Sequence, residues 1–249
     1  MRIVSAFFRI PNKYDIMCNN KSKEMYTQAM VNFFTYLKTQ PITFFTDLET
    51  YPLVKQLAGP NVEIQVRDFN YFPVFADIQQ PVWKEHMALN TEKYLTWELG
   101  AIWASKPYFV EEAAELHPEE EWFVWVDAGC VRTPDWAPPL EEFTTREQFT
   151  EPGVYIQALQ QLPTEPALIE YHPTEKFIAG GVALFHREHI NQYIEEYIRT
   201  FHEYTEAKKP AICDQFIMTT LAQRHSWIHP IQQRVKAVPD RWFFFLATL

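Results

Sequence analysis

The sequence lacks the patterns that mark several large classes of protein. Its three cysteines, Cys18, Cys130 and Cys213, are far apart and show no zinc-site spacing, which argues against a disulfide framework and favours reduced thiols in a cytosolic compartment. No apolar run approaches the roughly 18 residues of a membrane-spanning helix, so we expect no transmembrane segment, although peripheral membrane contact stays open. Acidic residues outnumber basic ones by 32 to 22, and the net charge of −10 argues against nucleic-acid binding.

The signature motifs of many common enzymes are missing too. There is no P-loop and no GxGxxG motif, and neither GxSxG, HExxH nor a kinase signature occurs. The 22 lysines and arginines still allow a local basic pocket, so an anionic small molecule remains an acceptable ligand. The sequence is 47% apolar and contains 20 phenylalanines, 12 tyrosines and 8 tryptophans, which is enough for a large core.

Apolar runs and helical periodicity alternate along the chain and predict one α/β domain over residues 1–249. Short β-prone runs occupy residues 3–8, 41–47 and 62–66, with helical patterns between them. This order is typical of a parallel sheet covered by helices. We therefore expect a Rossmann-type domain with a mixed, mostly parallel central sheet flanked by helices. Residues 70–90 have no clear period and are expected to form a long loop.

The second half of the chain predicts three more strands and three more helical segments. We expect the strands over residues 122–126, 153–158 and 177–185, and the helical segments over residues 91–116, 186–207 and 213–225. The first helical segment is expected to break near Lys106. The apolar run WFVWV at 122–126 fits a central strand that is buried on both faces.

Two predicted strands end in an acid. Asp127 follows the central strand, and Asp47 ends the strand over residues 41–47. Ligands gather at the carboxyl ends of strands in open α/β sheets, and a carboxylate there can bind Mg²⁺ or Mn²⁺. Gly129 would let a ligand approach the backbone beside Asp127. The alternatives are an ordinary turn for Asp127 and a helix cap for Asp47.

Glycines and a polar pair form the next candidates. Gly180 and Gly181 interrupt an apolar strand, which indicates a bulge or a close approach, with tight strand–helix packing as the alternative. Asp214 and Gln215 begin a helix, where together they suit hydrogen bonding to sugar hydroxyls. The alternative for Asp214 is helix N-capping.

Histidines and lysines add less specific candidates. His225 and His229 are four positions apart, but Pro230 makes a helical ligand pair doubtful. One of them could complete a metal shell around Asp127, and a structural role is the alternative for each. Lys93 and Lys106 could contact a phosphate, with a solvated lysine as the alternative.

Five stretches of the chain, taken together, resemble a known family. They are IVSAFFRI, PITFFTD, EKYLTWELGAIWASKPYFVEEAAELHPEEEWFVWVDAGCVR, FIAGGVALF and CDQFIM, and they lie between residues 3 and 225. In this order they resemble the HtrL/YibB family of bacterial and viral proteins, within the GT-A-type nucleotide-sugar glycosyltransferases. The resemblance implies a GT-A fold and a hexosyltransferase that uses a nucleotide-diphosphate sugar, foremost a UDP-sugar. It also implies a glycan or lipid-linked hydroxyl acceptor and assistance from Mn²⁺ or Mg²⁺.

The resemblance also implies roles for individual residues. Ser5, Ala6 and Phe7 would line the base pocket, and Lys93 would approach the diphosphate. Asp127 would hold the metal together with His225 or His229, and Gly180 and Gly181 would border the acceptor. Asp214 and Gln215, the catalytic pair, would meet the donor sugar. The sequence departs from the family at Gly129, where relatives carry the second acid of a DxD motif. One carboxylate and one histidine are few ligands for a divalent ion. Metal binding could therefore be weak or absent, or Asp47 could supply the missing carboxylate.

Two other functions stay open. A glycosyltransferase fold that binds nucleotide sugars without transferring them would explain the missing second acid at Gly129. A HAD-like phosphatase would use Asp127 as nucleophile, but it needs an acid two residues later, and Gly129 removes that acid.

Overall fold

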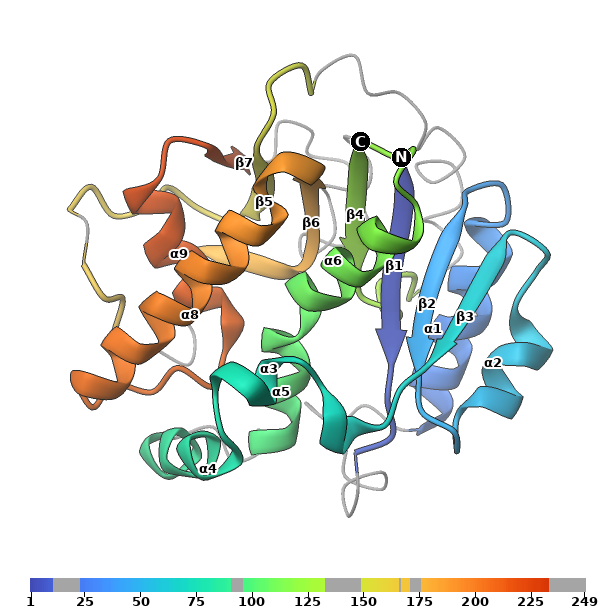
Figure 1. Cartoon of the computed structure of the whole chain (residues 1–249), viewed down its shortest axis with the longest axis horizontal. Coiled ribbons are helices and arrows are strands. Elements are labelled where there is room, and N and C mark those ends of the chain that lie inside the picture. The colour runs from blue at the N-terminus through green and yellow to red at the C-terminus, as the bar shows by residue number, and fades with distance from the viewer. Residues whose placement is uncertain (11–22, 91–95, 133–148, 166, 171–175, 233–249) are drawn as a thin grey trace.

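The computed structural model describes residues 1–10, 23–90, 96–132, 149–165, 167–170 and 176–232. Within these residues the chain forms one sheet with the strand order β3-β2-β1-β4-β6-β5-β7 (Figure 1). The strands are β1 (Arg2–Phe7), β2 (Ile42–Thr46), β3 (Val62–Val66), β4 (Trp122–Val126), β5 (Val154–Ala158), β6 (Ile178–His186) and β7 (Ile228–Gln232). Strands β1 to β4 are parallel, β6 is antiparallel to β4 and β5, and β7 is parallel to β5. The predicted mixed, mostly parallel sheet is confirmed.

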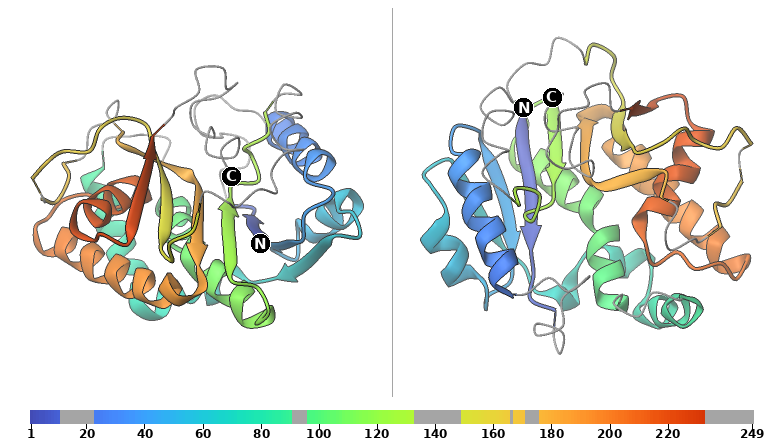
Figure 2. Two further views of the ribbon diagram at one scale, coloured as in Figure 1. Left: turned by 90° about the horizontal axis from the view of Figure 1, so that it is seen from above. Right: turned by 180° about the vertical axis from the view of Figure 1, so that it is seen from behind.

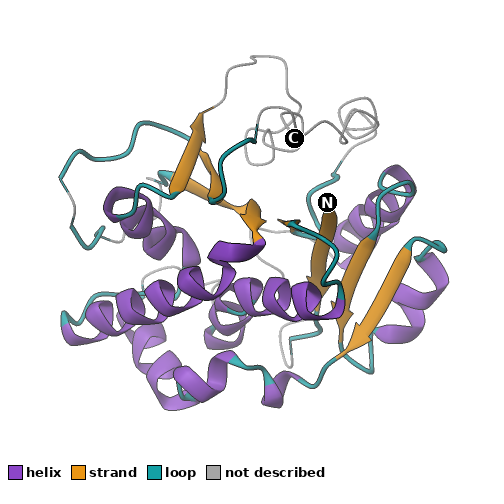
Figure 3. Cartoon of the chain, turned by 45° about the horizontal axis from the view of Figure 1, so that its top comes forward, coloured by secondary structure: helices purple, strands orange, loops and turns teal. Residues whose placement is uncertain are grey.

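Helices cover both faces of this sheet (Figures 1 and 2). On one face lie α1 (Lys23–Tyr36) and α2 (Tyr51–Leu57), and on the other lie α6 (Lys106–Leu116), α8 (Ile190–Glu206) and α9 (Asp214–Arg224). The shorter helices α3 (Val74–Asp77), α4 (Gln80–Leu89) and α5 (Trp97–Ala104) belong to the second group, and Figure 3 shows the strands between the two groups. In the described part of the chain, no helix is both long and apolar enough to cross a membrane.

Each face of the sheet has its own apolar core. On the α6 face, the ring of Phe109 stacks 4.7 Å from Phe45 of β2 and 6.1 Å from Trp125 of β4. Aromatic pairs of this kind bury large apolar surfaces and fix the orientation of the helix against the sheet. A short connection joins the end of α6 to the start of β4, so the helix and the strand run in opposite directions beside each other. The first residue of the helix, Lys106, consequently lies beside the end of β4.

Residues 70–90 do not form the long loop that we expected. They contain α3 and α4, and they begin within a 3₁₀ turn over Phe69–Tyr71. Trp83 of α4 is fully buried, its Nε1 donates to Ile78 O at 3.1 Å, and its ring lies 4.7 Å from the ring of Phe201 in α8. A short helix with few apolar positions gives a weak periodic signal, and its stability comes from tertiary packing.

Strand β7 was also not predicted. Its sequence, IHPIQ, contains Pro230, which has no N–H to donate to a neighbouring strand and is tolerated mainly at the edge of a sheet. In the described sheet β7 is the edge strand beside β5. A short edge strand with a proline carries little sequence signal.

Candidate active site

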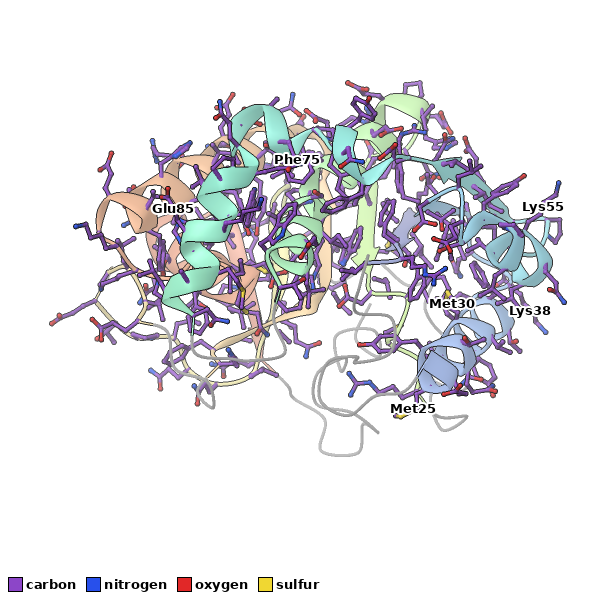
Figure 4. The ribbon with its side chains drawn as sticks, turned by 90° about the horizontal axis from the view of Figure 1, so that it is seen from below. Met25, Met30, Lys38, Lys55, Phe75 and Glu85 are labelled. Carbon is purple, nitrogen blue, oxygen red and sulfur yellow. The ribbon has the colours of Figure 1, made fainter. Side chains whose placement is uncertain are left out.

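The candidate site lies where β1 and β4 end. Backbone pairing between these strands stops at Val4 and Trp125, and beyond it the Ser5 hydroxyl donates to Val126 O at 2.6 Å. From β1 the chain continues to β2 and β3 on one side of β1 and then returns to β4 on the other side. Ligands in open α/β sheets bind at such changes of strand order. Figure 4 looks onto this end of the molecule, with α1 on one side and Phe75 of α3 on the other.

Asp127 is the first residue after β4. Its backbone N–H donates to Gly181 O at 2.8 Å, and its Oδ1 accepts a hydrogen bond from Trp125 Nε1 at 2.7 Å. Its carbonyl accepts the Cys130 N–H at 2.9 Å, so Asp127 also begins a turn. The Asp127 side chain is 35% exposed, which leaves part of the carboxylate open to a ligand. The turn and the ligand-facing carboxylate therefore coexist.

Lys106 joins the acidic side chains of the site. Its buried Nζ donates to Gly180 O at 2.7 Å and to Asp214 Oδ2 at 2.9 Å, and it lies 3.3 Å from Asp127 Oδ1. These three acceptors match the three hydrogens of an ammonium group. Burial lowers the pKa of Lys106, but the two carboxylates outweigh this and hold it above its ordinary value. Lys106 is therefore a buried cation rather than a solvated lysine.

Asp214 begins α9 but does not cap it, because the capping position belongs to Cys213. The Asp214 side chain is 5% exposed and points at Lys106. Burial raises the pKa of the Asp214 carboxyl, and the neighbouring ammonium counteracts that rise. The N-terminal end of the α9 dipole also favours the charged carboxylate. Asp214 thus stabilises Lys106 from inside the protein.

Gln215 ties the start of α9 to the sheet. Its Nε2 donates to the carbonyl of Ile178, the first residue of β6, at 2.7 Å. Its Oε1 accepts a hydrogen bond from Cys213 Sγ at 3.3 Å. Both ends of the amide are occupied, so a contact between Gln215 and a sugar would require one of these bonds to be exchanged.

The two glycines of β6 form a bulge, as predicted. The pairing between β5 and β6 jumps from Ile156–Ala183 to Gln157–Ala179, which leaves residues 180–182 out of register. A Cβ atom at Gly180 would lie 2.8 Å from Asp214 Oδ2, so tight packing also requires this glycine. The bulge turns the carbonyl of Gly180 to Lys106 and that of Gly181 to Asp127. The bulge therefore involves both glycines, whereas tight packing is shown for Gly180 alone.

A small cavity of about 20 Å³ lies behind these residues, on the α8 side of the sheet. Lys106, Asp214, Tyr193 and Tyr197 are among the residues around it, but its walls are almost entirely apolar. Burial raises the pKa values of both tyrosines, and the charge of Asp214 adds to the effect. A buried water molecule needs several polar partners, so these walls do not favour one.

The remaining residues predicted for the nucleotide lie at the end of β1 or outside the described residues. Ser5 is fully buried, whereas Ala6 and Phe7 are partly exposed. The ring of Phe7 lies 6.4 Å from that of Tyr26 in α1. Lys93 falls outside the described residues.

Asp47 has a local role in the turn before α2, but it is not the predicted helix cap, because the capping position belongs to Thr50. Its Oδ1 accepts the Thr50 N–H at 2.6 Å and its Oδ2 accepts the Arg9 N–H at 2.5 Å, just before α2 begins. Two strand spacings, about 10 Å, separate β2 from β4. The structure therefore does not bring Asp47 and Asp127 together.

The predicted metal partners of Asp127 also lie elsewhere. His229 belongs to the edge strand β7, three strand spacings or about 14 Å from β4. His225 follows the far end of α9, where its Nε2 lies 3.3 Å from Glu196 Oε2. The ring of His229 instead lies 4.5 Å from the ring of Tyr155. The strand order and the length of α9 separate both histidines from Asp127, which corrects the predicted grouping.

The described donor atoms do not fit a divalent metal ion. Asp127 Oδ1 is already engaged by Trp125 and Lys106, and Gly129 supplies no side-chain oxygen. Among the residues that the structure describes, no three His, Cys, Asp or Glu side chains are arranged to hold a metal. Mg²⁺ and Mn²⁺ prefer a shell of several oxygen ligands, which this part of the chain does not provide.

Comparisons with known proteins concern the fold. No family model and no curated protein matches the chain. The chain is similar to the apo structure of mouse xyloside xylosyltransferase 1, with 12% identity and a TM-score of 0.50 over 92% of this chain and 84% of that one. The chain has a GT-A-like fold.

Two further similar structures have lower scores. One is a glycosyltransferase involved in the glycosylation of the major capsid of PBCV-1, with 12% identity and a TM-score of 0.44 over 93% and 81% of the two chains. The other is CMP:2-keto-3-deoxy-manno-octonic acid synthetase complexed with CTP, with 11% identity and a TM-score of 0.46 over 93% and 88%.

The sequence had signalled Lys106 only weakly. It stands in the apolar context WASKPYFV, where Ser105 and Pro107 mark the predicted break between two helices, now α5 and α6. A lone charge in such a context suggests a buried, paired cation. Its partners could not be inferred, because Asp214 lies 108 positions further along the chain.

Proposed function

We propose that the protein is a glycosyltransferase that moves a sugar from a nucleotide-diphosphate sugar to a hydroxyl acceptor. The observation that carries this proposal is the meeting of Asp127, Lys106 and Asp214 at the carboxyl end of β4 in a GT-A-like fold. A polar cluster at this place suits a ligand that is rich in hydroxyl and phosphate groups.

The chemistry needs positioning more than covalent help from the protein. The bond between the anomeric carbon and the diphosphate breaks, and its electron pair leaves with the diphosphate. The acceptor oxygen bonds to the same carbon and gives its proton to the departing diphosphate. We assign the exposed part of Asp127 to hydroxyl groups of the donor, and the bulge at Gly180 and Gly181 to the border of the acceptor. Asp214 and Gln215 hold that bulge from behind.

The more specific assignments rest on the resemblance of the sequence to the HtrL/YibB family. We propose a UDP-sugar donor with its base against Ala6 and Phe7 and its diphosphate near Lys93. We also propose a hexosyl group and a glycan or lipid-linked acceptor. Membership of the HtrL/YibB family and a cytoplasmic location, with or without peripheral membrane contact, stay predictions.

Nucleotide binding and donor turnover test the proposal. UDP, GDP and CDP are compared by thermal shift, and release of UDP from UDP-hexoses and UDP-xylose is then followed. We expect UDP to raise the unfolding temperature and Asp127→Ala to lose most of that effect. Glu195→Ala, an exposed acid on α8, serves as the matched control. Absence of any nucleotide effect would contradict the proposal.

A second candidate is nucleotide-sugar binding without transfer. Two observations favour it: Asp214 is buried and paired, and Gly129 carries no acid. Binding of UDP with no release of UDP from any sugar donor would select this candidate. A chromogenic phosphate ester tests the phosphatase alternative in the same preparation, and we expect no hydrolysis.

A further inference from the structure

The two acidic side chains of the site already share a cation that belongs to the chain. Lys106 Nζ lies 2.9 Å from Asp214 Oδ2 and 3.3 Å from Asp127 Oδ1. Its third hydrogen is taken by Gly180 O at 2.7 Å, and the lysine side chain is only 9% exposed. The ammonium group is therefore a fixed part of the site and not a mobile surface charge.

This cation offsets part of the negative charge that the two carboxylates bring to the site. Asp127 and Asp214 contribute two negative charges and Lys106 contributes one positive charge, so the cluster carries one net negative charge instead of two. In a partly buried site such charges are weakly screened by solvent, and the difference matters to an approaching diphosphate. The second acid, Asp214, is engaged by Lys106, and among the described residues no three His, Cys, Asp or Glu side chains are arranged to hold a metal.

We propose that Lys106 is the resident cation of this site and that the protein binds a nucleoside diphosphate without requiring a divalent metal. The inference rests on the proposed function and specifies its electrostatics. Lys106 acts through Asp127 and Asp214, so it is a positioning residue and not a catalytic one. A site that already contains its own cation needs no second acid at residue 129 to bind a metal.

Gly129 offers a way to test the inference by gain of binding. A Cβ atom at this position would lie 3.5 Å from the ring of Tyr26, which is an ordinary contact, so the first atom of a side chain fits without rearrangement. Gly129→Asp adds a carboxylate two residues after Asp127. Gly129→Asn adds a side chain of the same size without the charge and is the matched control.

The first experiment measures Mn²⁺ binding in the absence of nucleotide, by the loss of the free-ion signal in electron paramagnetic resonance. We expect the wild type to bind Mn²⁺ with a dissociation constant above about 1 mM, and Gly129→Asp to bind at least about tenfold more tightly than Gly129→Asn. A wild type that binds Mn²⁺ as tightly as Gly129→Asp overturns the inference.

The second experiment titrates UDP into the wild type by calorimetry, once with EDTA and once with Mn²⁺. We expect the two dissociation constants to agree within about threefold. Binding that occurs only with Mn²⁺ overturns the inference and leaves the proposed function intact. Failure of UDP, GDP and CDP to bind in either buffer removes the proposed function and the inference with it.

Substitution of the lysine itself completes the test. In EDTA we expect Lys106→Met to weaken UDP binding by at least about tenfold, while Lys106→Arg, which keeps the charge, retains more of it. Unchanged UDP binding by folded Lys106→Met argues against the inference. Should Lys106→Met not fold, the Gly129 pair still decides the question.

Discussion

Two clusters of titratable side chains lie in different parts of the protein. They differ in what stabilises their polar groups away from water. At the carboxyl end of β4, Lys106, Asp127 and Asp214 are charged and each is paired. The second cluster, which we call the histidine cluster, consists of His186, His189, His225 and His229. Buried charges require partners, whereas neutral imidazole rings can pack as aromatic groups.

The histidine cluster shows this tolerance directly. His189 stacks 5.4 Å from Trp227, and His225 lies 5.3 Å from the same ring. Among the described residues, His189 Nδ1 and His229 Nε2 have no hydrogen-bond partner. Burial and the neighbouring His186 lower the pKa of His189, which favours its neutral form. The comparison predicts that substitutions cost much in the first cluster and little in the second.

The largest expected effect comes from removal of the Lys106 charge. Lys106→Met leaves Asp214 buried without its cation, and we expect a loss of about 3–5 kcal/mol in the free energy of unfolding, measured by urea denaturation. The double variant Lys106→Met/Asp214→Asn removes both charges and should recover much of that loss. A loss below about 1 kcal/mol in the single variant would show that the pair is not as buried as described.

The next effect is a loss of stability in acid that depends on His86. His86 Nδ1 accepts the Ala211 N–H at 3.1 Å, and its Nε2 lies 2.8 Å from Thr205 Oγ1, so the ring holds the segment before Asp214. Burial lowers the pKa of His86 from 6.5 to about 4. The unfolded chain therefore binds this proton first as the pH falls. The stabilisation is fully present above about pH 6.5 and is lost as the pH falls to about 4.

The expected size of this change is about 3 kcal/mol, from a shift of roughly two and a half pKa units. Urea denaturation between pH 7 and pH 4 measures it, and the difference between wild type and His86→Gln isolates the contribution of His86. An identical slope in both proteins would contradict the assignment. His189→Phe serves as the control from the histidine cluster and should alter the slope less.

Two glycines near the site give a smaller, matched contrast. Gly180→Ala places a Cβ atom 2.8 Å from the Asp214 carboxylate, and we expect a cost of about 1–3 kcal/mol in the free energy of unfolding. Gly129→Ala meets only the Tyr26 ring at 3.5 Å and should change stability by less than about 0.5 kcal/mol. Equal costs for the two variants would mean that the bulge is not constrained by Asp214.

The smallest effect is expected at the histidines that the sequence had suggested as metal ligands. His225→Gln and His229→Phe should leave the UDP dissociation constant within about twofold of the wild type, because both lie away from Asp127. Calorimetry with and without Mn²⁺ measures this. A large, Mn²⁺-specific loss in either variant would restore the histidine to the site.

The sequence predicted where strands end better than it predicted which residues the fold brings together. Asp127 at the end of a buried strand and the bulge at Gly180 and Gly181 followed from local patterns, and the structure confirms their positions. The predicted grouping of Asp127 with His229 was wrong, because the distance between the two residues depends on where β7 joins the sheet. Local periodicity carries no information about strand order.

By itself the sequence determined the alternation of strands and helices, the buried central strand and the break before Lys106, because each depends on residues close together in the chain. Only the tertiary structure decided that Lys106 meets Asp214, 108 positions away. That contact depends on α6 running back along β4, on the antiparallel pairing of β6 and on a glycine where any side chain would collide with the carboxylate. A buried charge then makes the contact obligatory, since neither ion is stable in the core without the other.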